Sequence, residues 1–307
     1  MKRLQSLLCI AAMSSLAGAS LAQQAAAPAA PDYSQVQEQS TDLGKGAYWI
    51  VGAGGNTTVV VGGDGIIVVD TQFAPLYDKL KAKITSLSDK PVRYVINTHY
   101  HGDHTGGNEP FIKAGATLVA HENVVKRMTT PPVNVYTNQP AGAWPVGAFP
   151  TKPYSTPTTK ISVVGQTAEL RHPNPAHTDG DSIVYFPEAN VLASGDIFTT
   201  NGYPNIDITV GAGIEGVIAA VDTMLSIAND QTKIVPGHGN VSNKAGLTEY
   251  RTMLVTARDR IAKAKAEGKT EEQVVAANLL ADLDTKWKVA GNANSERFPR
   301  NVYRTLK

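Results

Sequence analysis

The sequence contains very little cysteine, few aromatic residues and almost no excess of charge of either sign. Among 307 residues there are one Cys, 7% aromatic residues, and 28 Lys+Arg against 27 Asp+Glu. One cysteine cannot form an internal disulfide and excludes a cysteine-rich zinc site. The charge balance excludes a strongly basic nucleic-acid-binding protein and an acidic solvating tail. A metal site would have to use carboxylates and some of the seven histidines.

The first 22 residues have the pattern of a cleaved secretory signal. Lys2 and Arg3 precede an apolar run over residues 4–21, and small residues follow at the expected cleavage site after Ala22. A membrane anchor is the alternative, but serine and glycine dilute the run too much. Cleavage would remove Cys9 and change the formal net charge from +1 to −1. We therefore expect a periplasmic protein without a stable membrane anchor, in a compartment where a free thiol is a liability.

Residues 23–42 are rich in Ala, Gln and Pro and have few large apolar side chains. This composition predicts a flexible leader between the cleavage site and the fold. Hydrophobic residues make up 42% of the chain, which is enough for a large packed core. We therefore expect the catalytic domain to cover residues 43–307.

Within that domain, groups of short apolar strands are followed by helices, twice over. Runs of β-branched residues between glycine-rich turns predict strands, and apolar residues at helical spacing predict helices. The pattern predicts an α/β (α+β) fold of two sheet-plus-helix halves packed face to face. The first half has strands at 48–51, 57–61, 66–69, 92–96 and 117–120, with a helix after Pro75; the second has strands at 168–171, 182–186, 191–193 and 233–235, with helices at 216–228 and 247–266.

Two further segments allow two interpretations each. Residues 52–55 resemble a nucleotide-binding glycine loop, but a β-branched strand follows them, so a tight turn is favoured. Residues 130–158 are rich in Pro and aromatic residues. That segment is either an irregular surface loop or a flap that covers a substrate.

The most informative segment is Thr98–Asn108, which follows the strand at 92–96. His99 and His101 lie two residues apart on an extended segment, project to the same side and can share one metal ion. Asp103 and His104 follow Gly102 and can face a second ion. Imidazole and carboxylate are ligands that zinc accepts, so this cluster predicts a metal site.

This cluster resembles the His-x-His-x-Asp-His signature of the metallo-β-lactamase superfamily. Later segments also match family motifs, in the family's order: His177 in 175–181, Asp196 in 193–196 and His238 in 235–239. The resemblance implies an αββα sandwich with the metals at one edge, between the two sheets. It also implies two Zn(2+) ions per chain and the following ligands: His99, His101 and His177 for the first, Asp103, His104 and His238 for the second, with Asp196 bridging.

The resemblance also implies hydrolysis by a metal-bridging hydroxide, because bound dications lower the pKa of water. Asp103 would accept a hydrogen bond from the hydroxide and orient it. β-Lactamases with clinical roles usually carry Cys or Ser where this chain has Asp196, and aspartate there is similar to glyoxalase II and to lactone and phosphodiester hydrolases. The expected reaction is cleavage of an ester, lactone or amide-type bond, with a β-lactam as one possibility.

Export weighs against glutathione thioesters, and the mature charge of −1 against a tRNA substrate. Two other functions stay open: a mononuclear-iron persulfide-type oxidoreductase, which the complete second ligand set disfavours, and a metal-binding protein without catalysis. The substrate is expected to be a small molecule. Asn201 and Tyr203 either contact it or serve as turn residues. His121 is expected to be structural or to support a ligand, and His172 to lie on the surface; the sequence does not indicate an oligomeric state.

Overall fold

The computed structural model of the protein describes residues 31–289 and 293–307. The predicted signal (1–22) with Cys9, and residues 23–30 of the predicted leader, lie outside these ranges. The rest of the leader is more ordered than expected. Residues 39–42 belong to strand β1 and pair with β2, and the Lys79 ammonium donates hydrogen bonds to the carbonyls of Tyr33, Ser34 and Val36. The polar composition of this segment concealed these main-chain contacts.

The first sheet has seven strands whose order in the sheet is their order in the sequence. β1 to β4 are antiparallel neighbours, and β4 to β7 are parallel neighbours. The strands are β1 (Gln39–Gly44), β2 (Ala47–Val51), β3 (Thr57–Val61), β4 (Ile66–Val69), β5 (Val92–Ile96), β6 (Thr117–His121) and β7 (Lys152–Tyr154).

The second sheet has five strands in the order β12-β11-β10-β9-β8. Only the β11–β12 pair in this sheet is parallel. The strands are β8 (Thr158–Val163), β9 (Gln166–Arg171), β10 (Ile183–Phe186), β11 (Val191–Ala193) and β12 (Lys233–Val235).

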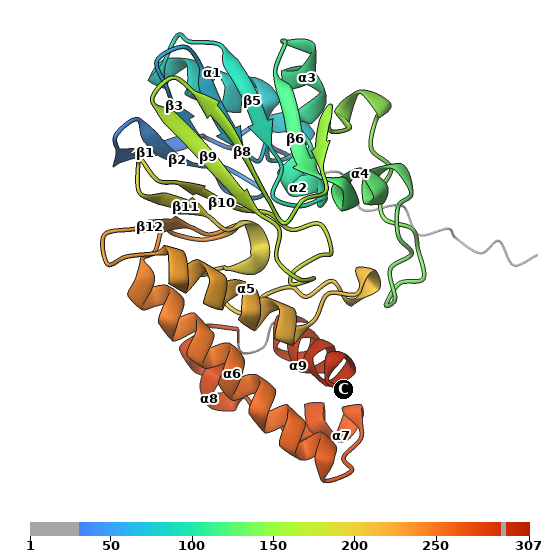
Figure 1. Ribbon diagram of the computed structural model, residues 1–307. Helices are drawn as coiled ribbons and strands as arrows, with labels where there is room; N and C mark the ends of the chain where they lie inside the picture. Colours follow the sequence, from blue (N-terminus) through green and yellow to red (C-terminus); the bar gives the residue numbers. More distant parts are fainter. Residues whose placement is uncertain (1–30, 290–292) are drawn as a thin grey trace, which may run out of the picture. The chain divides into compact units, whose positions relative to one another are not determined.

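Side chains alternate between the two faces of each sheet and so build a layered structure. In β4, Ile67 and Val69 pack with the second sheet, and Ile66 and Val68 pack on the opposite face against helices. Figure 1 shows the resulting layers, with helices outside both sheets. The helices of the first half are α1 (Tyr77–Leu87), α2 (Gly102–Thr105), α3 (Asn108–Lys113) and α4 (Glu122–Thr129).

On the outer face of the second sheet, Ile183, Leu192 and Ile234 pack against the C-terminal helices. The predicted αββα sandwich is therefore confirmed. None of the helices in the described ranges is long and apolar enough to cross a membrane. These C-terminal helices are α5 (Ile214–Ile227), α6 (Lys244–Ala266), α7 (Glu271–Ala276), α8 (Ala281–Lys286) and α9 (Ala293–Thr305).

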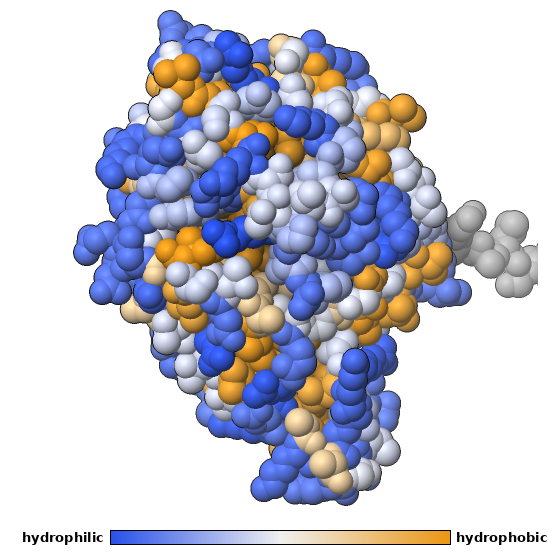
Figure 2. Space-filling view, viewed as in Figure 1, coloured by the Kyte–Doolittle hydropathy of each residue, from blue (hydrophilic) through white to orange (hydrophobic). Residues whose placement is uncertain are grey.

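The proline-rich segment 130–158 is irregular over most of its length before it enters β7 and β8. Three of its apolar residues, Val133, Val135 and Tyr136, are exposed, and Val146 is 82% exposed. Figure 2 shows hydrophobic residues at the right-hand edge of the molecule, where Figure 1 draws the green segment after α4. The segment also lines a large cavity, which is described below.

Candidate metal centre

The seven predicted ligands all follow the ends of strands, at the edge where the two sheets meet. Parallel strands end at the same edge of a sheet, so the segments after them converge. The ligands are His99 and His101 after β5, Asp103 and His104 in α2, His177 after β9, Asp196 in a short helix after β11, and His238 after β12.

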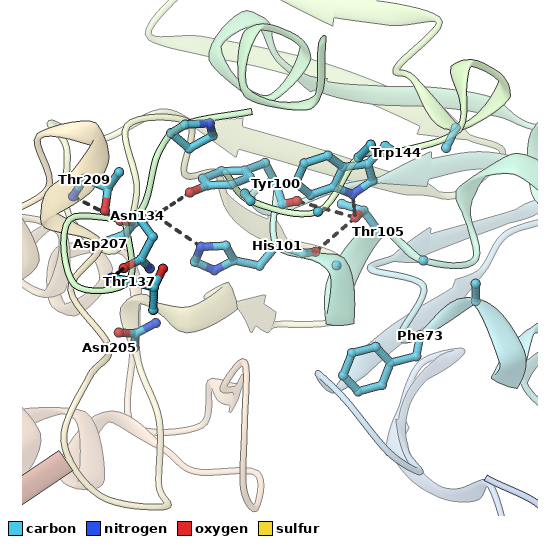
Figure 3. A pocket seen from close by; sticks show the side chains of 18 of the residues that line it. Phe73, Tyr100, His101, Thr105, Asn134, Thr137, Trp144, Asn205, Asp207 and Thr209 are labelled. Carbon is cyan, nitrogen blue, oxygen red and sulfur yellow. Dashed lines mark hydrogen bonds and ion pairs between the residues drawn. The ribbon is translucent and has the colours of Figure 1, made fainter. Parts of the chain in front are cut away.

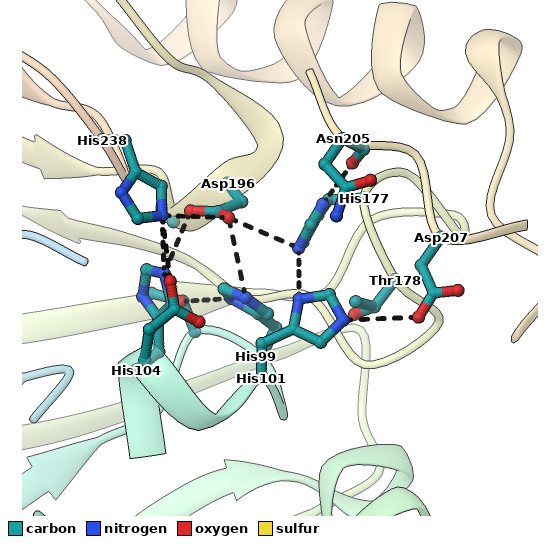
Figure 4. Close-up of polar contacts among 12 residues, drawn as sticks. His99, His101, His104, His177, Thr178, Asp196, Asn205, Asp207 and His238 are labelled. Atoms are coloured by element: carbon teal, nitrogen blue, oxygen red, sulfur yellow. Dashed lines mark hydrogen bonds and ion pairs between the residues drawn. The ribbon is translucent and has the colours of Figure 1, made fainter. Parts of the chain in front are cut away.

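The structure brings these residues together in two adjacent groups (Figure 4). Within each group the ligand atoms lie within 4.8 Å of one another. The groups are His99, His101, His177 and Asp196, and Asp103, His104 and His238, which are the two sets that the family resemblance implied.

Asp196 lies between the two groups. Its Oδ1 is 3.1 Å from His104 Nε2, and its Oδ2 is 3.4 Å from His238 Nε2. The same Oδ2 is 3.6 Å from His177 Nε2 and 4.0 Å from His99 Nε2. One carboxylate therefore reaches ligand nitrogens on both sides, as a bridging ligand must.

Outer hydrogen bonds orient the rings of His99 and His104. Asp70 Oδ2 lies 2.8 Å from His104 Nδ1 and accepts a 2.7 Å hydrogen bond from the Thr98 hydroxyl. The Thr98 oxygen in turn lies 3.0 Å from His99 Nδ1. Because the Nδ1 atoms are engaged, both rings present Nε2 to the centre. Such outer contacts fix ligand tautomers in metal sites.

The rings of His101 and His177 are held in the same way from the other side. Asp207 Oδ2 lies 3.3 Å from His101 Nε2, and the Asn205 carbonyl accepts from His177 Nδ1. The inner atoms, His101 Nδ1 and His177 Nε2, are 2.9 Å apart. His99, His101 and His177 thus present ring nitrogens to the first group, and His104 presents Nε2 to the second.

Two buried polar atoms of this site make no hydrogen bond within residues 31–289 and 293–307, namely His99 Nε2 and Asp196 Oδ1. Asp196 Oδ1 lies 3.1 Å from His104 Nε2 but outside hydrogen-bond geometry. Buried polar atoms are nearly always satisfied in native structures, so such orphans need an explanation. A cation held between imidazole and carboxylate donors would satisfy both atoms, and the donor set fits a borderline dication such as zinc.

The protonation states also suit cation binding. Burial lowers the pKa of His177 to about 4 and that of His99 well below its usual value, so both are neutral ligands at pH 7. Burial likewise disfavours protonation of His104 and His238, but the nearby carboxylates outweigh it and raise their pKa values, to about 9 for His238. The carboxylates around the centre thus favour positive charge there. A bound metal ion would displace the protons of His104 and His238 and supply that charge instead.

Two glycines permit the close packing of the site. A Cβ on Gly55 would lie 2.1 Å from the His104 ring, and one on Gly237 would lie 1.9 Å from Asp196 Oδ1. Any larger residue would therefore displace a ligand. The turn expected at 52–55 thus has a specific role, since it lets the β2–β3 connection lie against His104.

The two residues proposed to contact a substrate differ in position. Both line a polar cavity of about 540 Å³ beside His238 and Asp103. Asn201 is exposed there. Tyr203 is buried, and its hydroxyl donates a 2.6 Å hydrogen bond to Asp284, so that hydroxyl is already engaged.

The remaining two histidines form a stacked pair. The rings of His121 and His172 lie 3.5 Å apart and 9° from parallel. His121 is buried and accepts a hydrogen bond from the Asn123 amide at the start of α4. His172 was expected on the surface, but it is half-buried because it packs on His121 and contacts the Asp181 carbonyl.

Sequence reasoning missed Asp70 and Asp207. Asp70 directly follows β4, the strand beside β5, so its position at the end of an apolar strand was a usable signal. Asp207 lies in an irregular segment before a short 3-10 helix, and no pattern in the sequence marks it.

Comparison with known proteins places the chain among related sequences. The α subunit of 2,4-dinitroanisole O-demethylase from Nocardioides sp. (strain JS1661) is 29% identical over 183 residues, which are 57% of this chain and 51% of that protein. A metallo-beta-lactamase type 2 from Bacillus sp. (strain 170) is 25% identical over 195 residues, 62% of this chain and 68% of that protein. The chain thus spans about half the length of the demethylase subunit.

Solved structures show the same fold. The stereoselective inverting sec-alkylsulfatase Pisa1 from Pseudomonas sp. superposes with a TM-score of 0.68 at 20% identity, over 87% of this chain and 50% of that one. The sequence profile of the metallo-beta-lactamase superfamily matches residues 50–238, the range that carries all seven predicted ligands. The chain therefore belongs to the metallo-beta-lactamase superfamily.

Proposed function

We propose that this protein is an exported dinuclear zinc hydrolase that cleaves an ester, lactone or amide-type bond. The observation that carries the proposal is the Asp196 carboxylate, which lies 3.1 Å from His104 Nε2 and 3.6 Å from His177 Nε2 and so lies between the two ligand groups. Two bound zinc ions would act as Lewis acids and lower the pKa of a coordinated water toward neutrality.

Asp103 is the residue of this chain best placed to handle the proton of that water. Burial disfavours its ionised form, but the hydrogen bond with His238 and the charge of His104 lower its pKa to about 2. Its carboxylate is therefore ionised at neutral pH and lies 3.2 Å from His238 Nε2. It can accept a hydrogen bond from the attacking water and orient its oxygen toward a carbonyl carbon.

Hydrolysis then adds the hydroxyl of water to the acyl carbon and the proton to the leaving oxygen or nitrogen. The polar cavity over the centre is lined by Asp103, Asn201 and His238 and can hold the scissile group. Export rests on the pattern of residues 1–22 and is part of the proposal. A small-molecule substrate suits the size of this cavity.

Family membership alone does not select the bond that is cleaved. The relatives named above are an O-demethylase subunit, a β-lactamase and an alkylsulfatase. The bridging position favours ester or lactone cleavage, because Asp196 stands where the resemblance places Cys or Ser in clinical β-lactamases. A mononuclear-iron oxidoreductase is disfavoured, since it would leave Asp103, His104 and His238 without a role.

The proposal can be tested by activity screening. The zinc-loaded protein is assayed against an ester, a lactone, a β-lactam, a thioester and a phosphodiester. We expect hydrolysis of the ester or lactone, and a loss of about 10²- to 10⁴-fold in kcat/KM for Asp103→Ala, since general acid–base groups contribute about that much.

Asp89→Asn is the control, because Asp89 is an exposed aspartate away from the site. It should keep wild-type activity, and circular dichroism should show both variants folded. Full activity of Asp103→Ala with no metal bound would contradict the proposal, as would the absence of hydrolysis with all five substrates.

A further inference from the structure

A second cavity of about 640 Å³ lies beside the metal centre, on the side of His101. It is bounded by the segment at 132–148, by the residues around Phe73, and by residues of α3 and α9. Its volume is typical of cavities that enclose a drug-sized molecule. The two cavities adjoin, because His101 and Asn205 line both of them.

Aromatic rings form the walls of this cavity (Figure 3). Tyr100 and Trp144 lie side by side, with ring centroids 5.9 Å apart, and Phe73 lies on another wall. Tyr136 and four prolines also line it. Aromatic and proline side chains present apolar faces that favour uncharged apolar groups.

The polar groups of the walls are engaged with one another. Trp144 Nε1 donates a 2.8 Å hydrogen bond to Thr105 Oγ1. The Asp207 carboxylate accepts from the Tyr100 hydroxyl and from the Thr209 amide. These pairs satisfy the polar groups of Trp144, Tyr100 and Asp207, so this part of the wall presents mainly apolar faces to a ligand, while Asn134, Thr137 and Asn205 also line the cavity.

The charged side chains of the walls do not favour an anion. Arg297 is the one Lys or Arg that lines the cavity within the described residues, and its guanidinium lies over the ring of Tyr136, 5.9 Å from the centroid. Glu109 and Asp207 also line the cavity and carry negative charge, although Glu109 forms a 2.7 Å ion pair with Lys113. An uncharged group avoids the cost of dehydrating a charge in this mixed surrounding.

We propose that this cavity binds an uncharged aromatic or bulky alkyl substituent of the substrate while the scissile group lies at the metal centre. The inference rests on the proposed hydrolase function and names its substrate class: neutral esters or lactones with a large apolar substituent. The substituent extends past His101 and Asn205, the residues shared by the two cavities. Val133 and Val135, which are exposed, alternate in the sequence with the lining residues Pro132, Asn134 and Tyr136.

The test is direct binding of a neutral probe, 2-naphthylmethanol, to the zinc-loaded full-length protein by titration calorimetry. Trp144→Ala should weaken binding about tenfold or more, since it removes one aromatic wall. Tyr136→Ala should also weaken it, and because Tyr136 is 42% exposed this variant should fold normally even if Trp144→Ala does not. Methanol, which lacks the naphthyl group, should bind at least about tenfold more weakly than the naphthyl alcohol.

Val164→Ala is the matched control, because Val164 is an exposed apolar residue in the β8–β9 turn and does not line the cavity. It should bind the alcohol like the wild type. Three results would overturn the inference: unchanged binding in both cavity variants, equal weakening in the control, or equal binding of methanol and the naphthyl alcohol.

The link to catalysis is tested with two acetate esters whose leaving alcohols are of similar basicity, ethyl acetate and 2-naphthylmethyl acetate. The naphthylmethyl ester should have a kcat/KM at least about tenfold higher. Binding of the alcohol without hydrolysis of any ester would contradict the proposed function but not the apolar site. Hydrolysis of both esters at equal kcat/KM, without binding of the alcohol, would contradict the apolar site alone.

Discussion

At the scale of single residues, the site depends on carboxylates that do not face the centre themselves. Asp70 contacts His104 Nδ1 and also accepts hydrogen bonds from the Thr98 amide and hydroxyl. Thr98 in turn contacts His99 Nδ1. One buried carboxylate therefore orients imidazoles in both candidate ligand groups.

Replacing Asp70 by Asn should weaken metal binding about 10- to 100-fold, as is usual when such an outer partner is lost. Asn is a conservative choice, because Asp70 has a φ of 64°, a conformation that Asn tolerates. The measurement is competition with a chelator of known zinc affinity. Asp89→Asn should leave the affinity unchanged, and an equal affinity in Asp70→Asn and the wild type would contradict this role.

His121 predicts a pH dependence of stability. Burial, with a smaller effect of His172, lowers its pKa from 6.5 to about 4. The native state therefore binds this proton less readily than the unfolded chain. The stability linked to neutral His121 is fully present above about pH 6.5, and the free energy of unfolding decreases as the pH falls from there toward 4. In His121→Phe, the free energy of unfolding should fall less steeply over this window.

The measurement is denaturant unfolding at several pH values between 4 and 8. The slope against pH isolates the titration of His121, since the hydrogen bond to Asn123 that the variant also loses should lower stability similarly at every pH. Parallel pH profiles for the variant and the wild type would show that His121 does not titrate as expected.

At the scale of elements, α4 fixes the loop that carries His177. Arg127 on α4 pairs with Asp179 through its Nε and Nη2, at 3.1 and 2.6 Å, and Asn123 donates to the Asp179 carbonyl at 2.7 Å. Both charged side chains are largely buried, with 19% and 11% exposed. Loss of one partner would leave the other unpaired in a poorly hydrated position.

Arg127→Met should therefore lower the free energy of unfolding by about 2 kcal/mol, in the range found when a hydrogen-bonded charged group loses its partner. The control is Arg251→Met, whose partner Asp222 is also held by two contacts but in an exposed pair. That change should cost less than about 0.5 kcal/mol. If the two variants lost equal free energy of unfolding in urea, the Arg127–Asp179 contact would stabilise the protein no more than an exposed ion pair.

Elements with strong apolar patterns could be predicted, and others could not. The strands β3 to β5, β11 and β12 were predicted at their observed bounds and β2 one residue short at its start, because apolar runs rich in β-branched residues lie between clear turns. β8 was missed because only two of its six residues, Ile161 and Val163, are apolar, with Ser162 between them and Thr and Lys before them. β7 contains Pro153, and α9 contains Pro299, residues that normally argue against a strand or helix interior.

At the scale of the whole molecule, the centre exists because two sheets place distant segments at one edge. Asn56 of the β2–β3 connection donates to the carbonyls of Pro236 and Gly239, at 2.9 and 2.8 Å, and so ties the first half to the His238 loop. The grouping of the candidate ligands could be predicted because the motif around His99 to His104 is compact and the later motifs keep the family's order. The contacts of Asp207 and the apolar cavity could not, since they depend on irregular segments with no sequence period.

The most direct test of the dinuclear centre is elemental analysis of the purified wild-type protein. The two groups around Asp196 predict about two zinc ions per chain, since each offers a complete set of imidazole and carboxylate ligands. One iron per chain, or no bound metal, would contradict the account.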